Sequence, residues 1–173
     1  PIIGYLGALV AFRLDVEMIR YIAIKKPTWS IVLVGPEDDV FKKSDLHRMA
    51  NVHFLGPKKE AEIARYIHFF DVAINPQVVN EVTVGNYPRK LDEYLSLGKA
   101  TVVTRTNATE DFSEFVYEAE SKESFLSAIE KALAEDSPER RELRVRFERN
   151  NTWEKVMGRI ATVVEKVARE KGL

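Results

Sequence analysis

The stretch YPRKLDEYLSLG, residues 87–98, predicts a helix with a defined start and a defined end. Pro88 suits the first helical position, where its missing N–H costs nothing, and Asn86 just upstream can cap the helix. Gly98 can close the helix in a left-handed conformation. One face carries apolar residues at spacings of three and four, which predicts that this face is buried. The face consists of Leu91, Tyr94, Leu95 and Gly98.

The polar face of the same predicted helix carries Lys90 and Glu93, one turn apart. The free N–H groups and the positive dipole end of a helix favour an anion, and Lys90 adds a positive charge beside them. A carboxylate one turn deeper can accept hydrogen bonds from the two vicinal hydroxyls of a ribose. The stretch can therefore be a nucleotide site, or an ordinary amphipathic helix with a surface Lys–Glu pair. Taken alone, it favours the second interpretation.

Strand-like and helix-like runs alternate along the rest of the chain. The continuous apolar run at 29–34 indicates a strand that is buried on both faces. The alternation predicts an α/β fold: a Rossmann-like, doubly wound parallel sheet of about six strands, with helices on both faces and a helical C-terminus. We expect strands at 1–6, 29–34, 51–55, 71–74, 100–104 and 115–118. We expect further helices at 15–26, 44–49, 60–69 and 121–135, two more after Ser137 and Asn151, and a loop at 37–44.

Ligands of doubly wound sheets bind beyond the carboxyl ends of the strands, at the point where the strand order reverses. Four loops should converge there, at residues 5–13, 35–44, 56–59 and 77–86. The helix that contains Lys90 starts from the last of these loops. We therefore expect Lys90 at this edge of the sheet.

Composition indicates one soluble domain, residues 1–173, whose 45% hydrophobic content is enough for a full core. A net charge of −1 gives no electrostatic case for nucleic acid or for an anionic membrane surface. The absence of cysteine fits a reducing compartment, so we expect a cytoplasmic location. No stretch has transmembrane length, and the chain opens at Pro1 on an apolar run, which suggests a piece excised from a longer protein.

Five segments together carry a family resemblance across nearly the whole chain. They are GYLG at 4–7, VLVGP at 32–36, NVHFLG at 51–56, FDVAINP at 70–76 and PRKLDEYLSLGK at 88–99. In this order, they resemble the C-terminal, donor-nucleotide-binding domain of a GT-B fold, family-4-like retaining glycosyltransferase (group 1 glycosyl transferase).

The resemblance implies an enzyme that moves a glycosyl group from a UDP- or GDP-linked nucleotide sugar to a saccharide or lipid-linked acceptor. The implied setting is polysaccharide or cell-envelope assembly. Residues 1–173 would be its single donor-binding domain, with the N-terminal acceptor domain absent, so this fragment alone would be inactive. No metal and no cofactor besides the donor substrate are implied. The missing domain could place the enzyme peripherally at the inner face of the membrane.

The resemblance also implies roles for particular residues near the diphosphate of the donor. The loop at Gly7 would bring its backbone close to the pyrophosphate, where a side chain would clash. Arg13 and Lys90 resemble the basic pair that neutralises the diphosphate leaving group. The alternatives are a tight turn at Gly7 and a solvated helix-start residue at Arg13.

The implied nucleoside contacts come from two other segments. Gly56 and Pro57 lie where the family's loop faces the nucleobase, although a strand-ending turn is the alternative. Glu93 resembles the family's ribose-binding carboxylate.

Many relatives carry a second glutamate before this one, in an E-x7-E pattern. Here that position is Gly85, and Glu81 lies four residues too early.

The pattern Asn80-x-x-Thr83, with Asn86 and Pro88-x-Lys90, resembles instead a branch of polysaccharide-assembly transferases. In that branch Thr83 and Asn86 would take over donor contacts. Whether Glu81 or Thr83 replaces the absent first glutamate stays open.

Two rival functions remain. An NAD-dependent Rossmann module would need G-x-G-x-x-G after the first strand and an acid about 20 residues further on. This chain has only Gly4-x-x-Gly7, and Glu37, the first acid after the second strand, lies too far away. A non-catalytic nucleotide-binding module of the receiver type would need an acidic cluster at the end of the first strand, where Tyr5-Leu6-Gly7 offers none.

Other charged groups do not predict sites. Asp38 and Asp39 are typical of solvated loop acids rather than of a metal site. The arginines of 140–149 alternate with glutamates, which indicates a salt-bridged helix surface rather than an RNA-binding patch. Three histidines lie on separate elements without the spacing of zinc ligands. They are His47, His53 and His68.

The last predicted helix carries a wide apolar stripe. In the GT-B family this helix crosses back onto the N-terminal domain, so part of the stripe should be bare in this fragment. A bare apolar patch tends to recruit another surface, so we expect self-association of the fragment. The stripe consists of Trp153, Val156, Met157, Ile160, Val163, Val164 and Val167.

Overall fold

The computed structural model describes residues 1–151 and 153–171, apart from the side chains of residues 153, 156 and 159. Within this part of the chain, six strands form one parallel sheet in the order β3-β2-β1-β4-β5-β6. The strands are β1 (Ile2–Leu6), β2 (Ser30–Val34), β3 (Val52–Phe54), β4 (Val72–Asn75), β5 (Ala100–Thr104) and β6 (Tyr117–Ala119). This arrangement confirms the predicted fold class.

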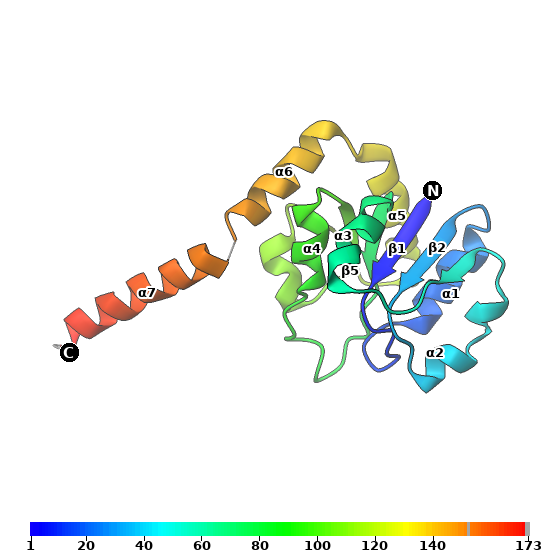
Figure 1. Ribbon diagram of the computed structural model, residues 1–173, viewed down its shortest axis with the longest axis horizontal. Helices are drawn as coiled ribbons and strands as arrows, with labels where there is room; N and C mark the ends of the chain where they lie inside the picture. The colour runs from blue at the N-terminus through cyan, green and yellow to red at the C-terminus, as the bar shows by residue number, and fades with distance from the viewer. Residues whose placement is uncertain (152, 172–173) are drawn as a thin grey trace.

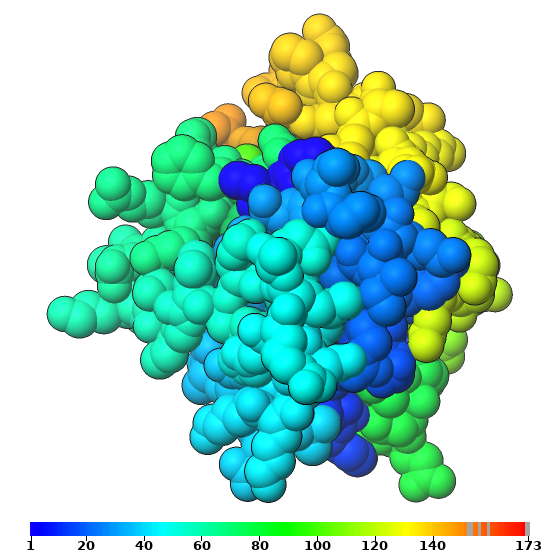
Figure 2. All heavy atoms as spheres, turned by 90° about the vertical axis from the view of Figure 1, so that its right-hand side faces the viewer, coloured from blue at the N-terminus to red at the C-terminus, as the bar shows by residue number. Residues whose placement is uncertain are grey.

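Helices cover both faces of the sheet. The helices of the described residues are α1 (Val16–Lys25), α2 (Asp39–Lys43), η1 (Asp45–Arg48), α3 (Glu60–His68), α4 (Lys90–Ser96), η2 (Asn107–Phe112), α5 (Lys122–Glu135), α6 (Pro138–Arg149) and α7 (Trp153–Glu170), and not all of them lie on the sheet. On one face α1 and α5 share a buried core with the sheet, where Ile19 and Ile129 join Ile31. On the other face α3 and α4 pack on the sheet, and α6 packs against α4. Figure 2 shows the blue and cyan N-terminal segments forming one continuous side of the molecule, with the yellow segment of α5 along its margin.

The helix starts follow local capping chemistry. The Asp15 carboxylate accepts a hydrogen bond of 2.9 Å from the Met18 N–H, which begins α1. The hydroxyl of Ser121 accepts from Ser124 N–H at the start of α5, and Ser137 with Pro138 starts α6 as predicted. These three caps explain why the predicted helix starts are confirmed.

Two local predictions were wrong. The polar run 37–44, predicted as a loop, contains α2, because Asp38 accepts hydrogen bonds from Val40 and Phe41 N–H and caps a short helix. Phe41 is buried and anchors this helix to the core. Asp38 also accepts from Ala11 N–H at 2.8 Å, so it joins two loops instead of being solvated.

The start of the helix expected at 87–98 also differs from the prediction. α4 begins at Lys90, with Arg89 as its cap residue and no side-chain capping bond, so Asn86 does not cap it. Pro88 lies in a preceding turn, where its carbonyl accepts from Leu91 N–H at 2.8 Å. The end is as predicted, because Gly98 has a φ of +70° in the left-handed region. The predicted buried face is confirmed.

α7 extends away from the sheet and its covering helices (Figure 1). The apolar side chains that are described along it are between 41% and 60% exposed. They are Met157, Ile160, Val163, Val164 and Val167. The side chains of Trp153 and Val156, the other members of the predicted stripe, lie outside the described part. The exposed stripe is therefore observed for these five residues, and self-association stays a prediction.

Candidate functional site

The strand order reverses between β1 and β4, and the loops that follow these two strands are joined by hydrogen bonds. Asp15 N–H donates to the Pro76 carbonyl at 2.8 Å, and Val78 N–H donates to the Arg13 carbonyl at 2.9 Å. The Asn80 side chain adds a third link, from Nδ2 to the Phe12 carbonyl at 2.9 Å. Because β1 crosses over to β2 on one side while β4 lies on the other, these loops flank the switch point, where doubly wound folds bind ligands.

The loops after β2 and β3 join the same edge. Leu9 N–H donates to the Pro36 carbonyl at 2.8 Å, and Gly35 N–H donates to the Gly56 carbonyl at 3.1 Å. The convergence of the four predicted loops is therefore confirmed. Backbone hydrogen bonds between the loops fix the edge on which the candidate residues lie.

Lys90 reaches across this edge. It starts α4 on one face of the sheet, yet its Nζ lies 5.3 Å from the ring centroid of Tyr5, which packs in the core of the opposite face. The lysine stem passes over Gly7, because a Cβ built on Gly7 would overlap Cε of Lys90 and lie 3.1 Å from Nζ. Gly7 also has a φ of +140°, which other residues rarely adopt. The backbone conformation favours glycine here, and any larger residue would also displace the end of the Lys90 side chain.

Charges of both signs surround Lys90. Burial lowers the pKa of Lys90, the neighbouring Arg13 lowers it further, and Glu93 opposes the shift. Burial likewise raises the pKa of Glu93, against the attraction of Lys90 and Arg89. Arg13 and Glu93 are both exposed. The structure thus brings the predicted basic pair and the predicted ribose carboxylate within electrostatic range of one another, an arrangement suited to an anion that carries hydroxyl groups.

The predicted nucleobase loop is open to solvent. Gly56 has a φ of +66°, and a Cβ built on it would meet no atom within 4 Å. Pro57 beside it is exposed. Glycine is therefore required here by backbone conformation and not by lack of space. The role of this loop toward a base stays a prediction.

Thr83 and Asn86 differ in accessibility. Thr83 is 1% exposed, and its hydroxyl accepts from Asn80 N–H at 2.9 Å and donates to the Val78 carbonyl. In this conformation Thr83 orders its own loop. Asn86 is exposed, and so is Glu81. Donor contacts of Thr83 and Asn86 therefore stay predictions, and those of Thr83 would require the loop to rearrange.

Sequence reasoning missed two tyrosines of this site. The sequence pattern places Tyr5 in a strand and Tyr94 on a buried helix face, and it assigns a site role to neither. Both hydroxyls form hydrogen bonds with the backbone near the end of β1. The Tyr5 hydroxyl donates to the Ala8 carbonyl at 3.1 Å, and the Tyr94 hydroxyl accepts from Leu6 N–H at 2.9 Å. A tyrosine hydroxyl in an otherwise apolar strand or face is the signal that could have pointed to them, because a buried hydroxyl needs a partner.

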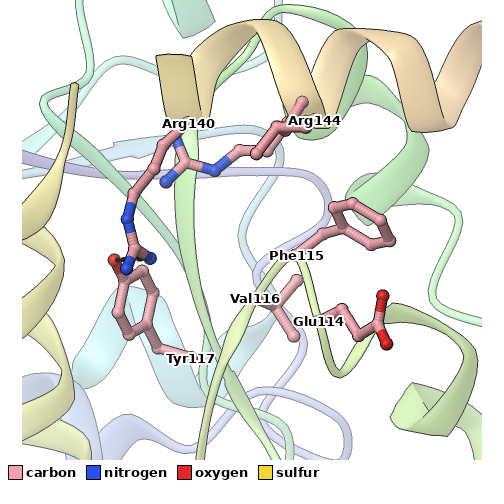
Figure 3. A pocket seen from close by; sticks show the side chains of 7 residues that line it. Glu114, Phe115, Val116, Tyr117, Arg140 and Arg144 are labelled. Carbon is pink, nitrogen blue, oxygen red and sulfur yellow. Dashed lines mark hydrogen bonds between the residues drawn. The ribbon is translucent and has the colours of Figure 1, made fainter. Parts of the chain in front are cut away.

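A cavity lies away from the switch point. Its volume is about 470 Å³, and it lies between the edge of the sheet at β6 and helix α6 (Figure 3). Figure 3 shows the Arg140 guanidinium at the hydroxyl of Tyr117, and these groups are 3.2 Å apart. Arg144 donates to Asp136 at 2.7 Å and to the Gly98 carbonyl at 3.0 Å. These arginines serve the packing of α6.

The described residues contain no group of three or more His, Cys, Asp or Glu side chains that could hold a metal ion. In the same part of the chain, no helix is both long enough and apolar enough to cross a membrane.

Comparisons with known proteins agree on one family. Residues 1–135 match the family described as glycosyl transferases group 1. A Bacillus subtilis (strain 168) protein named as a teichuronic acid biosynthesis glycosyltransferase, TuaH, is 30% identical over 161 residues, which are 88% of this chain and 40% of TuaH. The chain thus spans less than half the length of this curated relative.

Solved structures share the fold. The crystal structure of Anabaena Alr3699/HepE in complex with UDP and glucose has a TM-score of 0.70 at 18% identity, over 95% of this chain and 48% of that one. The catalytic domain of the Helicobacter pylori cholesterol-α-glucosyltransferase has a TM-score of 0.69 at 18% identity, over 87% of this chain and 98% of that one. At such identities the likeness shows the fold alone.

Proposed function

The chain belongs to the glycosyl transferases group 1, and we propose that its switch-point site binds the nucleoside diphosphate part of a nucleotide sugar for glycosyl transfer. One observation carries this proposal: the side chain of Lys90 passes over the backbone of Gly7 at the carboxyl edge of the sheet, and the charge of Arg13 acts on its ammonium group. A cation over a glycine backbone, with a second cation within electrostatic range, matches the charge of a diphosphate.

The two cations would act on the leaving group. When the bond between the sugar's anomeric carbon and the diphosphate oxygen breaks, both electrons stay on the oxygen and the diphosphate gains negative charge. Lys90 and Arg13 would stabilise this charge, and the half-buried position of Lys90 reduces its screening by water. An acceptor hydroxyl would then form the new bond to the anomeric carbon, and its proton would pass to the oxygen of the departing diphosphate.

The remaining assignments follow from position. Glu93 would accept hydrogen bonds from the two ribose hydroxyls, since it lies one turn beyond Lys90 on α4. The loop at Gly56 and Pro57 would face the base. Thr83 and Asn86 would contact the donor from the loop after β4, with Asn86 the more accessible of the two.

The wider proposal concerns the whole enzyme. Residues 1–173 would form the single donor-binding domain, and an N-terminal domain would supply the acceptor site. The donor would be UDP- or GDP-linked, with no metal or other cofactor, and the acceptor a saccharide or a lipid-linked saccharide in polysaccharide or cell-envelope assembly. The name of TuaH supports this setting. The enzyme would be cytoplasmic and peripheral at the inner face of the membrane.

Calorimetric titration with UDP, GDP and NAD tests the proposal against its rival, an NAD-binding module. We expect UDP or GDP to bind and to raise the melting temperature, and NAD to give no heat. UDP is the first probe, because the crystal structure of HepE contains it. Binding of NAD without binding of either nucleoside diphosphate would overturn the proposal.

A further inference from the structure

We propose that Tyr5 is a positioning residue for Lys90, holding the lysine ammonium at the diphosphate site through its ring and the Gly7 loop through its hydroxyl. The inference rests on the proposed function, because it concerns the same site. Tyr5 itself is 3% exposed and neutral, since burial raises its pKa, so it acts through its neighbours and not by touching the donor.

The placement of Lys90 needs an explanation, because the side chain leaves its own face of the sheet. α4 packs on the face covered by α3, whereas Tyr5 belongs to the core beneath α1 and α5. A lysine side chain loses much rotamer freedom when it is held in one conformation. An exposed start of a helix would leave it free to point into solvent. The ring of Tyr5 supplies an attraction that favours the crossed position.

The contact is a cation–π interaction. Nζ of Lys90 lies 5.3 Å from the centroid of the Tyr5 ring, within the range at which the ring quadrupole attracts an ammonium group. Lys90 is half-buried, so water screens this attraction less than it would on an open surface. Gly7 makes the approach possible, because a Cβ there would occupy the path of the lysine stem.

The hydroxyl of the same tyrosine fixes the loop. It donates to the Ala8 carbonyl at 3.1 Å, directly after Gly7, while Gly7 N–H donates to the Val34 carbonyl at 2.8 Å. One side chain therefore holds both parts of the anion site, the cation from α4 and the backbone from the β1–α1 loop. These parts are more than 80 residues apart in sequence.

Arg13 makes this restraint necessary before the donor binds. Arg13 and Lys90 repel each other, as the lowered pKa of Lys90 reflects in part. Without a bound anion, this repulsion drives the flexible lysine away from the loop. The Tyr5 ring opposes it, so Lys90 is already in place when a diphosphate arrives, and the ligand does not have to order this side chain.

NMR of the ligand-free chain tests the contact independently of any ligand. The ε-CH₂ protons of Lys90 should be shifted upfield by the ring current of Tyr5. We expect the shift to remain in Tyr5→Phe and to disappear in Tyr5→Leu. Absence of an upfield shift in the wild type would overturn the inference, whether or not the proposed function holds.

Calorimetry with UDP tests the consequence. Loss of a partly desolvated cation–π contact should weaken UDP binding about five- to thirty-fold in Tyr5→Leu. Tyr5→Phe, which keeps the ring and loses only the loop hydrogen bond, should weaken it about three-fold or less. Tyr21→Leu is the matched control, because Lys25 lies 5.7 Å from the Tyr21 ring on α1 and we place neither in the site. Equal weakening by Tyr5→Phe and Tyr5→Leu would overturn the role of the ring.

Two further variants separate the possible failures. If Lys90→Ala leaves UDP binding unchanged, the proposed role of Lys90 at the diphosphate is wrong. The NMR experiment on the ligand-free chain then still tests the contact between Tyr5 and Lys90. If Lys90→Ala weakens binding and Tyr5→Leu does not, the inference fails and the proposed function stands.

If Tyr5→Leu does not fold, pentafluorophenylalanine in place of Tyr5 is the alternative variant. It keeps the shape of a phenylalanine ring and reverses the ring quadrupole. Binding weaker than in Tyr5→Phe supports the inference, and equal binding overturns it.

Discussion

The hydroxyl of Tyr94 on α4 accepts a hydrogen bond of 2.9 Å from the backbone N–H of Leu6, the last residue of β1. β1 pairs with β4 at Ile3 and Gly4, and the Tyr94 hydroxyl satisfies the N–H of Leu6, two residues beyond this pairing. Tyr94 therefore fastens α4, and with it Lys90, to the point where the two strands diverge.

Tyr94→Phe should destabilise the fold. The change leaves the buried Leu6 N–H without its partner, which costs about 1–3 kcal/mol of the free energy of unfolding. Urea denaturation measures this loss. Tyr21→Phe is the control, because Tyr21 on α1 is only half-buried. A Tyr94→Phe variant as stable as the wild type would show that the hydrogen bond contributes nothing.

Glu93→Gln should weaken binding of UDP or GDP. The variant keeps the shape of the side chain and removes the charged acceptor, and hydrogen bonds to a charged group contribute about 1.5–3 kcal/mol, so affinity should fall about ten-fold or more. Glu123→Gln, in the first turn of α5, is a control outside the proposed site. Unchanged nucleotide affinity of Glu93→Gln in calorimetry would place the ribose elsewhere.

Glu148→Gln should change how stability depends on pH. Glu148 on α6 is 9% exposed, and its Oε1 is buried without a hydrogen-bond partner in the part of the chain that is described. Burial and then the charge of Asp92 raise its pKa to about 7, above the ordinary 4.5. The folded chain therefore keeps a proton that the unfolded chain releases, and the stability this confers is lost as the pH rises through about 7.

Glutamine stays neutral, so Glu148→Gln should be more stable than the wild type at about pH 8, by on the order of 1 kcal/mol, and should show a flatter pH dependence. Urea denaturation at about pH 5 and pH 8 measures both. Glu142→Gln, an exposed position on the same helix, should leave the dependence unchanged. Parallel stability curves for wild type and Glu148→Gln would contradict the raised pKa.

The isolated chain should bind a nucleoside diphosphate weakly and transfer no sugar. The proposed acceptor site belongs to another domain, and binding of the donor alone does not bring a hydroxyl to the anomeric carbon. Incubation of the chain with radiolabelled UDP-sugars and a panel of saccharide acceptors measures transfer. If the isolated chain forms product and the Lys90→Ala control does not, the proposal that the acceptor site lies in another domain is wrong.

The exposed stripe on α7 should make the isolated chain associate with itself. Ile160 and Val164 are 50% and 60% exposed, and most of a helix's stability in proteins comes from packing of its apolar face, so burial against a second copy should stabilise both helices. Sedimentation velocity should show a concentration-dependent dimer that Ile160→Glu abolishes. Thr162→Glu, on the opposite side of the same helix, is the control. A wild type that stays monomeric at high concentration would leave self-association without support.

The sequence alone determined the features that depend on neighbours along the chain. The period of apolar residues distinguished strands from helices, and the capping residues Asp15, Ser121 and Ser137 placed helix starts. The same local pattern placed Gly98 at the end of α4. The alternation of elements then predicted which loops meet, because a parallel sheet collects the carboxyl ends of its strands at one edge.

Tertiary structure decided the features that depend on segments far apart. Nothing near Tyr5 in sequence indicates that Lys90 crosses the sheet edge to its ring, since 85 positions separate them. Likewise, Asp38 becomes a link between loops only where the fold brings it to Ala11. Hydrogen bonds and burial of this kind depend on the packed arrangement of the chain, and periodicity and capping carry no information about them.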